Sequence, residues 1–99
     1  DLGRIGGLTI ADELSELAQD TGARAVPHAF GTGVLLAASA QWAATMEEPL
    51  TEFTRAPSPL AQNLVAHEIQ FREGKLHLTD APGLGVDLDE SIVNQYRVN

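Results

Sequence analysis

The chain has no cysteine among its 99 residues, which excludes disulfide bonds, thiol catalysis and cysteine-based zinc sites. That absence fits a cytoplasmic protein. Basic residues are also scarce, since six Lys and Arg stand against 14 Asp and Glu and give a formal net charge of −8. Such a balance argues against nucleic acid or an anionic membrane surface as a partner. The longest largely apolar run, from Val34 to Ala40, is far too short to cross a bilayer.

The length bounds the fold. Ninety-nine residues can form one small domain but not a complete eight-stranded α/β barrel, which needs roughly 250 residues. The chain also begins without Met, inside a motif, and no targeting segment precedes that motif. We therefore expect this chain to be a piece of a longer protein.

The first strong periodic pattern predicts an amphipathic helix that ends at Gly22, a residue typical of the position just past a helix. Thr9 is the expected N-cap, which places the acidic residues Asp12 and Glu13 in the first turn at the positive end of the helix dipole. One apolar stripe follows helical spacing and consists of Ile10, Leu14, Leu17 and Ala18.

A second helix is expected from about Thr32 to Met46, between two short strands. It is apolar nearly all round, so it should be buried on most sides, which again implies more protein than these residues supply. Glu47, Glu48 and Pro49 stop it. The two strands are predicted at residues 23–27 and 50–54, and Glu52 lies near the end of the second.

The pattern changes after this point. A Pro-rich connector covers residues 55–60, and apolar residues then alternate with polar ones on either side of Glu73-Gly74, which predicts a β-hairpin. Asp89 is the expected cap of a short helix over residues 90–96. His67 and His77 flank the hairpin and are interpreted as solvent-facing, without a metal role. Residues 1–56 thus carry strand–helix units, and residues 57–99 carry a connector, a hairpin and a tail.

Asp1 and His28 are the main candidates for chemistry, because each is expected at the end of a strand that feeds a helix. Neighbouring parallel strands of an α/β barrel present such residues at one mouth, where these folds keep their active sites. An Asp beside a His fixes the imidazole tautomer and raises its basicity. The pair is interpreted as a general base, against the simpler alternative of a structural contact.

Four segments together resemble the C-terminal part of the mandelate racemase/muconate lactonizing enzyme branch of the enolase superfamily. They are residues 1–9 (DLGRIGGLT), 26–28 (VPH), 50–53 (LTEF) and 82–85 (PGLG). The resemblance covers essentially the whole chain. It implies the last units of a (β/α)7β barrel, with residues 57–99 joining a capping domain.

The resemblance also implies roles. His28 would be the general base, Asp1 would hold it, and Glu52 would be an acid hydrogen-bonded to a substrate carboxylate. The Mg²⁺ ligands and a Lys base of this family would lie upstream of residue 1. The segment 28–33 (HAFGTG) is more like the acid-sugar dehydratases than like mandelate racemase, so dehydration of a sugar acid is favoured.

Several alternatives stay open. Racemisation, epimerisation and cycloisomerisation use the same proton abstraction, and an inactive homologue or a purely structural fragment would use none. Glu52 has a salt-bridged strand-end acid as its simpler interpretation. Arg4 is either a partner of Asp1 or a surface residue, and Phe30 either lines the pocket beside His28 or is a core aromatic. The expected partner is a small carboxylate substrate, and the full-length enzyme is expected to be a homo-oligomer.

Overall fold

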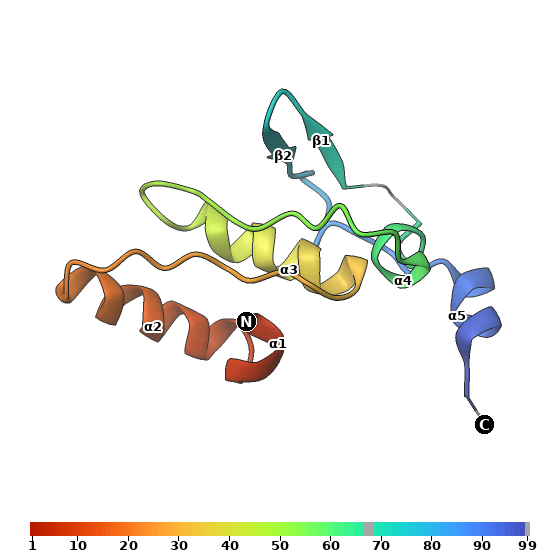
Figure 1. Cartoon of the computed structure of the whole chain (residues 1–99), viewed down its shortest axis with the longest axis horizontal. Helices are drawn as coiled ribbons and strands as arrows, with labels where there is room; N and C mark the ends of the chain where they lie inside the picture. Colours follow the sequence, from red (N-terminus) through yellow and green to blue (C-terminus); the bar gives the residue numbers. More distant parts are fainter. Residues whose placement is uncertain (67–68, 99) are drawn as a thin grey trace.

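The computed structural model describes residues 1–66 and 69–98, so the expectation for His67 lies outside the described residues. Three helices form its centre. They are α1 (Leu2–Ile5), α2 (Leu8–Asp20) and α3 (Gly33–Ala44). Figure 1 shows that the chain leaves α2 and returns in an extended segment to the start of α3, and that a second extended segment follows α3 in the same direction. This strand–helix rhythm is the one that the sequence predicts for residues 1–56.

A single helical turn opens the chain. Asp1 is its N-cap, because the carboxylate oxygen Oδ1 accepts a hydrogen bond from the Gly3 backbone N–H at 3.0 Å. Gly6 adopts a left-handed conformation with φ 108° and stops the helix after one turn. The predicted cap of the next helix is wrong: α2 begins at Leu8 with Gly7 as N-cap, and Thr9 lies inside it.

The earlier start of α2 has a physical cause. Gly7 has φ 93°, a conformation that side-chain-bearing residues rarely adopt, so the chain can turn straight from α1 into α2. No acidic residue then falls in the first turn, and Asp12 and Glu13 lie farther along the helix than expected. The end of α2 is confirmed, since Gly22 takes φ 70° just beyond Thr21.

The core lies between α1, α2 and α3. Leu2, Ala11 and Trp42 are its buried members. The Trp42 indole Nε1 donates to Ser15 Oγ at 2.9 Å, and that hydroxyl donates to the Ala11 carbonyl at 3.1 Å, so the polar edge of the ring is satisfied inside the core. The apolar helix α3 is buried on most sides, as predicted.

Three members of the apolar stripe of α2 (Ile10, Leu14 and Leu17) are exposed, whereas its fourth member, Ala18, is half-buried. Small side chains (Ala11, Ser15 and Ala18) point inward and let α2 approach Trp42 closely. Leu14 and Leu17 are 39% and 58% exposed instead. The stripe therefore has the predicted spacing, but much of its apolar surface is exposed.

The two predicted strands are not formed as strands. Residues 23–27 and 50–54 are extended but lack a hydrogen-bonded ladder, and one backbone bond joins them, from Glu52 N to Pro27 O at 3.1 Å. A strand is defined by its pairing, and a parallel strand in a barrel pairs on both edges. Among the described residues these segments have only each other, so the expected strands appear as extended chain.

The second half of the chain follows the prediction closely. The hairpin is β1 (Gln70–Arg72) with β2 (Lys75–His77), in antiparallel register, and Glu73 and Gly74 both take positive φ in the turn. That geometry is the two-residue turn that suits a hairpin. His77 is exposed, as expected.

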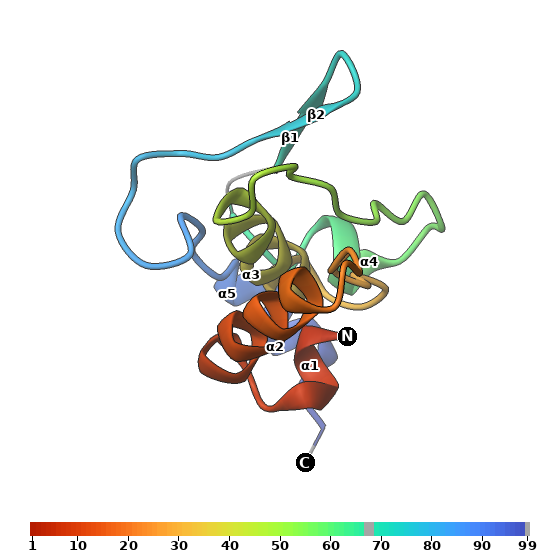
Figure 2. The same cartoon turned by 90° about the vertical axis from the view of Figure 1, so that its left-hand side faces the viewer.

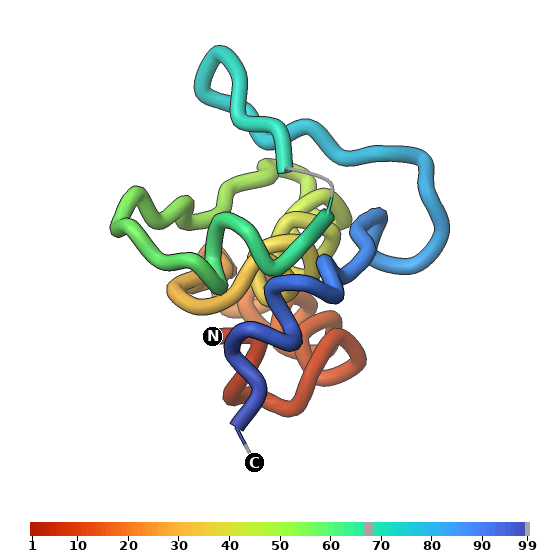
Figure 3. Tube along the Cα trace, turned by 90° about the vertical axis from the view of Figure 1, so that its right-hand side faces the viewer, coloured from red at the N-terminus to blue at the C-terminus, as the bar shows by residue number. Residues whose placement is uncertain are grey.

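Two short helices complete this half: α4 (Pro59–Gln62) and α5 (Glu90–Tyr96). Asp89 caps α5 through its carboxylate, as predicted. An isolated antiparallel bridge between Val65 and Leu88 ties the tail to the segment after α4. Figures 2 and 3 show the hairpin at one end of the molecule and α1 and α2 at the other, with α3 between them. Within the described ranges, no helix has the length and apolar character needed to span a membrane.

Candidate active site

The two extended segments run parallel (Figure 1), and contacts between them recur at one sequence offset. Arg24 donates to the Glu48 carbonyl at 3.1 Å, Thr51 Oγ1 donates to the Pro27 carbonyl at 3.3 Å, and each pair is 24 positions apart. His28 faces Glu52 at the same offset. Glu48 thus lies level with Arg24, at the end of the segments away from His28.

Burial alternates along the first extended segment. Pro27 and Ala29 are buried against the helices, whereas Val26, His28 and Phe30 are exposed. This alternation has the two-residue period of a β-strand. It puts His28 and Glu52 on the same open face, because Glu52 is also exposed while Thr51 is half-buried.

The structure brings Asp1, His28 and Glu52 together in one line. The Asp1 Oδ2 atom lies 3.2 Å from His28 Nδ1, at the long end of hydrogen-bond range. Glu52 Oε2 lies 3.6 Å from His28 Nε2, too far for a hydrogen bond but close enough for an electrostatic contact. The imidazole therefore lies between two carboxyl groups, with Asp1 within hydrogen-bond distance of Nδ1 and Glu52 in a longer contact with Nε2.

These carboxylates differ in exposure. The Asp1 side chain is 19% exposed, because its Oδ1 atom is held by α1, whereas the side chains of His28 and Glu52 are about half exposed. A neutral imidazole that donates Nδ1–H to Asp1 keeps a free lone pair on Nε2. The site can therefore offer Nε2 as a base toward the open face.

Arg4 and Phe30 border this line of residues. The Arg4 Nε atom lies 3.4 Å from Asp1 Oδ2, so the partner interpretation is supported by a contact. The Phe30 ring is 6.4 Å from the His28 ring between centroids, tilted by 31°. Phe30 is 63% exposed, so its interpretation as a core aromatic is wrong.

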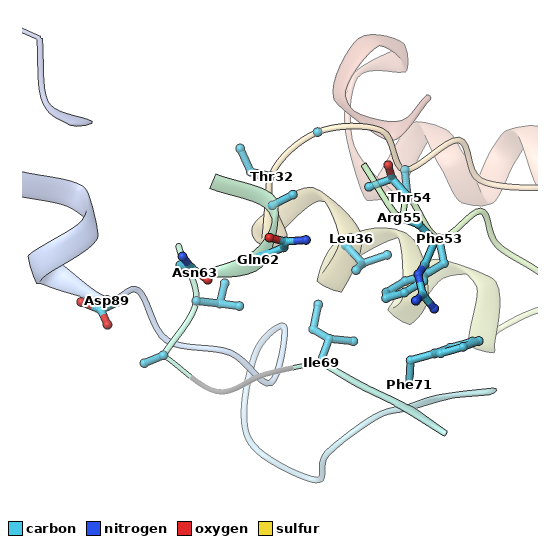
Figure 4. A pocket seen from close by; sticks show the side chains of 15 residues that line it. Thr32, Leu36, Phe53, Thr54, Arg55, Gln62, Asn63, Ile69, Phe71 and Asp89 are labelled. Carbon is cyan, nitrogen blue, oxygen red and sulfur yellow. The ribbon is translucent and has the colours of Figure 1, made fainter. Parts of the chain in front are cut away.

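Two open cavities lie next to the site. The smaller one, of about 290 Å³, is lined in part by Phe30, Glu52 and Thr54. The larger one, of about 790 Å³, does not reach Asp1, His28 or Glu52. Figure 4 shows this larger cavity, with Phe53 and Phe71 at one side and Asp89 at the other. Of the three site residues, the smaller cavity reaches Glu52 alone.

The residues that the structure describes do not form a magnesium site. Mg²⁺ prefers near-octahedral oxygen ligands, and residues 1–66 and 69–98 contain no group of three or more His, Asp or Glu side chains that could hold a metal. Asp1 and Glu52 are separated by the His28 ring, which lies between them. No step of the chemistry is therefore assigned to a metal held by this chain.

Two contributors to the site were missed by sequence reasoning. Gly3 fixes the Asp1 carboxylate through its N–H, and Thr51 fastens the second extended segment to Pro27. The first could have been found, because an Asp followed five residues later by Gly6 and Gly7 is a start and a stop for a one-turn helix. The hydroxyl of Thr51 gives no comparable signal in the sequence.

Comparison with known proteins gives one consistent picture. The family model described as "Enolase C-terminal domain-like" matches residues 1–92. A D-galactarolactone cycloisomerase from Agrobacterium fabrum is 32% identical over 99% of this chain and 28% of its own length. A D-galactonate dehydratase family member from Streptomyces is 34% identical over 95% of this chain and 22% of its own length.

A solved structure agrees with these relatives. The 3,6-anhydro-D-galactonate cycloisomerase from Zobellia galactanivorans superimposes with a TM-score of 0.84 and 33% identity, over 92% of this chain and 26% of that one. The chain thus spans about a quarter of the length of the proteins it matches. It corresponds to the C-terminal portion of their barrel fold. The chain belongs to the enolase C-terminal domain-like family, in the mandelate racemase/muconate lactonizing enzyme branch of the enolase superfamily.

Proposed function

We propose that this chain supplies the general base of an enolase-superfamily enzyme that removes the proton α to the carboxylate of a sugar acid and then dehydrates it. The observation that carries the proposal is the alignment of Asp1, His28 and Glu52 along two parallel segments, with His28 Nδ1 3.2 Å from Asp1. Two of the matched relatives are named as acting on galactonate or galactarolactone compounds, which supports a sugar acid as substrate. The proposed full protein that contains this chain is called the barrel-length enzyme.

His28 acts as the base in this scheme. Asp1 accepts the Nδ1 proton and so directs the free lone pair of Nε2 toward the open face. Nε2 takes the α proton, and the electron pair of the broken C–H bond moves into the carboxylate to form an enediolate. Histidine is the side chain that most often serves as a general base for such a proton transfer.

Water leaves in the second step. The β C–O bond breaks, the enediolate electrons form the C=C double bond of an enol, and the departing hydroxyl takes the proton that His28 acquired. The enol then tautomerises to a 2-oxo-3-deoxy acid. His28 ends as it began, so the residue serves first as base and then as acid.

Glu52 has a separate role. Its carboxyl group lies on the same open face as His28 and lines the cavity of about 290 Å³. A protonated Glu52 would donate a hydrogen bond to the substrate carboxylate, where negative charge grows as the α proton leaves. The distance of 3.6 Å to Nε2 leaves the base free of a competing hydrogen bond from this residue.

Cycloisomerisation is the second candidate reaction, because two of the matched proteins carry that name. The same proton abstraction would be followed by departure of a ring oxygen rather than a hydroxyl, and the oxygen would stay in the molecule. Mass spectrometry distinguishes the two reactions, since dehydration removes one water and cycloisomerisation leaves the mass unchanged.

The remaining parts of the proposal concern the whole enzyme. The Mg²⁺ expected from the family resemblance would be held by residues outside this chain, and it would stabilise the enediolate charge. We also propose that the barrel-length enzyme is cytoplasmic and forms a homo-oligomer. The chain alone should not turn over sugar acids with added Mg²⁺, because it forms no metal site among its described residues.

The test is exchange of the α proton into D₂O. The barrel-length enzyme is incubated with a panel of sugar acids and their lactones, and deuterium incorporation is followed by NMR. His28→Asn should lower exchange by about 10²–10⁴-fold, because Asn cannot act as a base. His77→Asn is the matched control, since His77 is an exposed histidine on β2, away from the site. Exchange at the wild-type rate in His28→Asn would reject the assignment.

A further inference from the structure

Arg4 reaches the same carboxylate oxygen as His28. The Asp1 Oδ2 atom lies 3.2 Å from His28 Nδ1 and 3.4 Å from Arg4 Nε, whereas Oδ1 is occupied by the Gly3 N–H at 3.0 Å. The oxygen that faces the base therefore also faces a cation. Any change in the charge of Arg4 must act on the Asp1–His28 contact.

The local fold fixes this arrangement. Arg4 lies one helical turn after Asp1, and its backbone N–H donates to the Asp1 carbonyl at 2.9 Å. Gly6 ends α1 directly afterwards, so the turn has no other basic residue. The Arg4 side chain is 85% exposed, which means that the core does not need it for packing.

We propose that Arg4 is a positioning residue, which holds Asp1 Oδ2 against His28 and lowers the proton affinity of the His28 ring by drawing negative charge away from it. The inference rests on the proposed function, because it assigns control of the same base. Arg4 forms its ion pair with Asp1 Oδ2 and not with His28 or Glu52, so in this proposal it acts through Asp1.

The charges around His28 define the sign of the effect. The Asp1 carboxylate lies within 4 Å of the ring and favours its protonated form, and Glu52, also within 4 Å, adds to this effect only when it is ionised. Arg4 is the cation that opposes them, through the oxygen that it shares with His28. Removing its charge should make the ring easier to protonate, so more His28 would be in the acid form at a given pH.

The size of the effect is small because Arg4 is in water. The charge of Arg4 acts on His28 through Asp1 and is largely solvated and screened by salt. Its removal should move the His28 curve by about 0.2–0.5 pH units. At about 1 M salt the Debye length falls to about 3 Å, so most of the shift should vanish. A change caused by lost packing would not depend on salt in this way.

The experiment measures two curves. The first is the pH profile of α-proton exchange by the barrel-length enzyme. The second is the ring NMR titration of His28 in the barrel-length enzyme, with the signal assigned by comparison with His28→Asn. Arg4→Gln should move the acid limb of the profile and the His28 ring curve to higher pH at low salt. Arg4→Lys keeps the charge and should restore the wild-type curves.

Arg24→Gln is the matched control. It removes a positive charge at the far end of the extended segment that carries His28, where Arg24 pairs with Glu48. It should leave both curves in place. Wild-type curves in Arg4→Gln would overturn the inference, as would equal shifts in Arg4→Lys or in Arg24→Gln. If the wild-type enzyme exchanges no α proton, the proposed function fails, but the ring titration still decides the role of Arg4.

Discussion

Replacing Asp1 by Asn separates the orientation of His28 from the fold of its surroundings. Asn is as good an N-cap as Asp, so its side-chain oxygen can keep the bond from the Gly3 N–H, and α1 should persist. Its amide nitrogen would then occupy the place of Oδ2, opposite His28 Nδ1. A donor would face the position that now needs an acceptor, and the tautomer with the proton on Nε2 would be favoured.

The expected loss follows from the contact that disappears. A hydrogen bond to a charged group contributes about 1.5–3 kcal/mol, and the Asp1 side chain is only 19% exposed, so solvent replaces little of it. That free energy corresponds to roughly a 10- to 150-fold fall in kcat/KM of the barrel-length enzyme, since 1.36 kcal/mol is tenfold. Circular dichroism and a thermal melt should remain close to wild type.

A double-mutant cycle tests the reasoning. If Asp1 acts only through His28, then adding Asp1→Asn to His28→Asn should cost almost nothing further, because the group it orients is already gone. The readout is α-proton exchange for the two single variants and the double variant. Losses that multiply would refute the mechanism and would give Asp1 a direct role in the reaction.

Three further predictions follow from other contacts. Glu52→Gln should weaken both substrate affinity and turnover, by about 10–100-fold in kcat/KM. His28→Asn should leave affinity unchanged, so calorimetry of inhibitor binding distinguishes the loss of affinity from the loss of turnover. Trp42→Phe removes the bond from the indole to Ser15 and part of the core volume, so the free energy of unfolding should fall by about 1–3 kcal/mol in a urea titration. Hydrogen bonds from the Ser91 side chain, then from the Ile92 and Ser91 backbone, lower the pKa of Asp89 below 3.8. Its contribution to stability is therefore complete above pH 3.8 and fades as the pH falls through the lowered value. Asp89→Asn should remove this pH dependence in thermal melts recorded at falling pH.

The elements that the sequence predicts well are those stabilised by local signals. The hairpin turns at Glu73-Gly74, and α5 begins after Asp89, because turn and cap preferences act over a few residues. The end of α2 at Gly22 has the same origin. The start of α2 was misplaced because Gly7 competes with Thr9, and only the folded backbone shows that Gly7 takes the required conformation.

The elements predicted poorly depend on partners at a distance. Residues 23–27 and 50–54 have the alternation of strands but only one backbone bond between them. The stripe through Leu14 and Leu17 has helical spacing, but spacing does not say whether a face meets a core or solvent. Placement at two predicted strand ends did predict one contact: Asp1 and His28 meet as expected, while the support from Gly3 and Thr51 emerges only in three dimensions.

The fixed sequence offset between the two extended segments indicates which positions face each other on the open face, and this is useful for protein design. Val26 and Leu50 are separated by the same 24 positions as His28 and Glu52, and both are exposed, at 40% and 48%. They form the next facing pair along the segments. Polar side chains introduced at these two positions would lie two residues before His28 and Glu52 along the segments. There the introduced pair could bind a larger substrate or a metal ion. The backbone bond between Glu52 and Pro27 fixes that geometry before any new side chain is chosen.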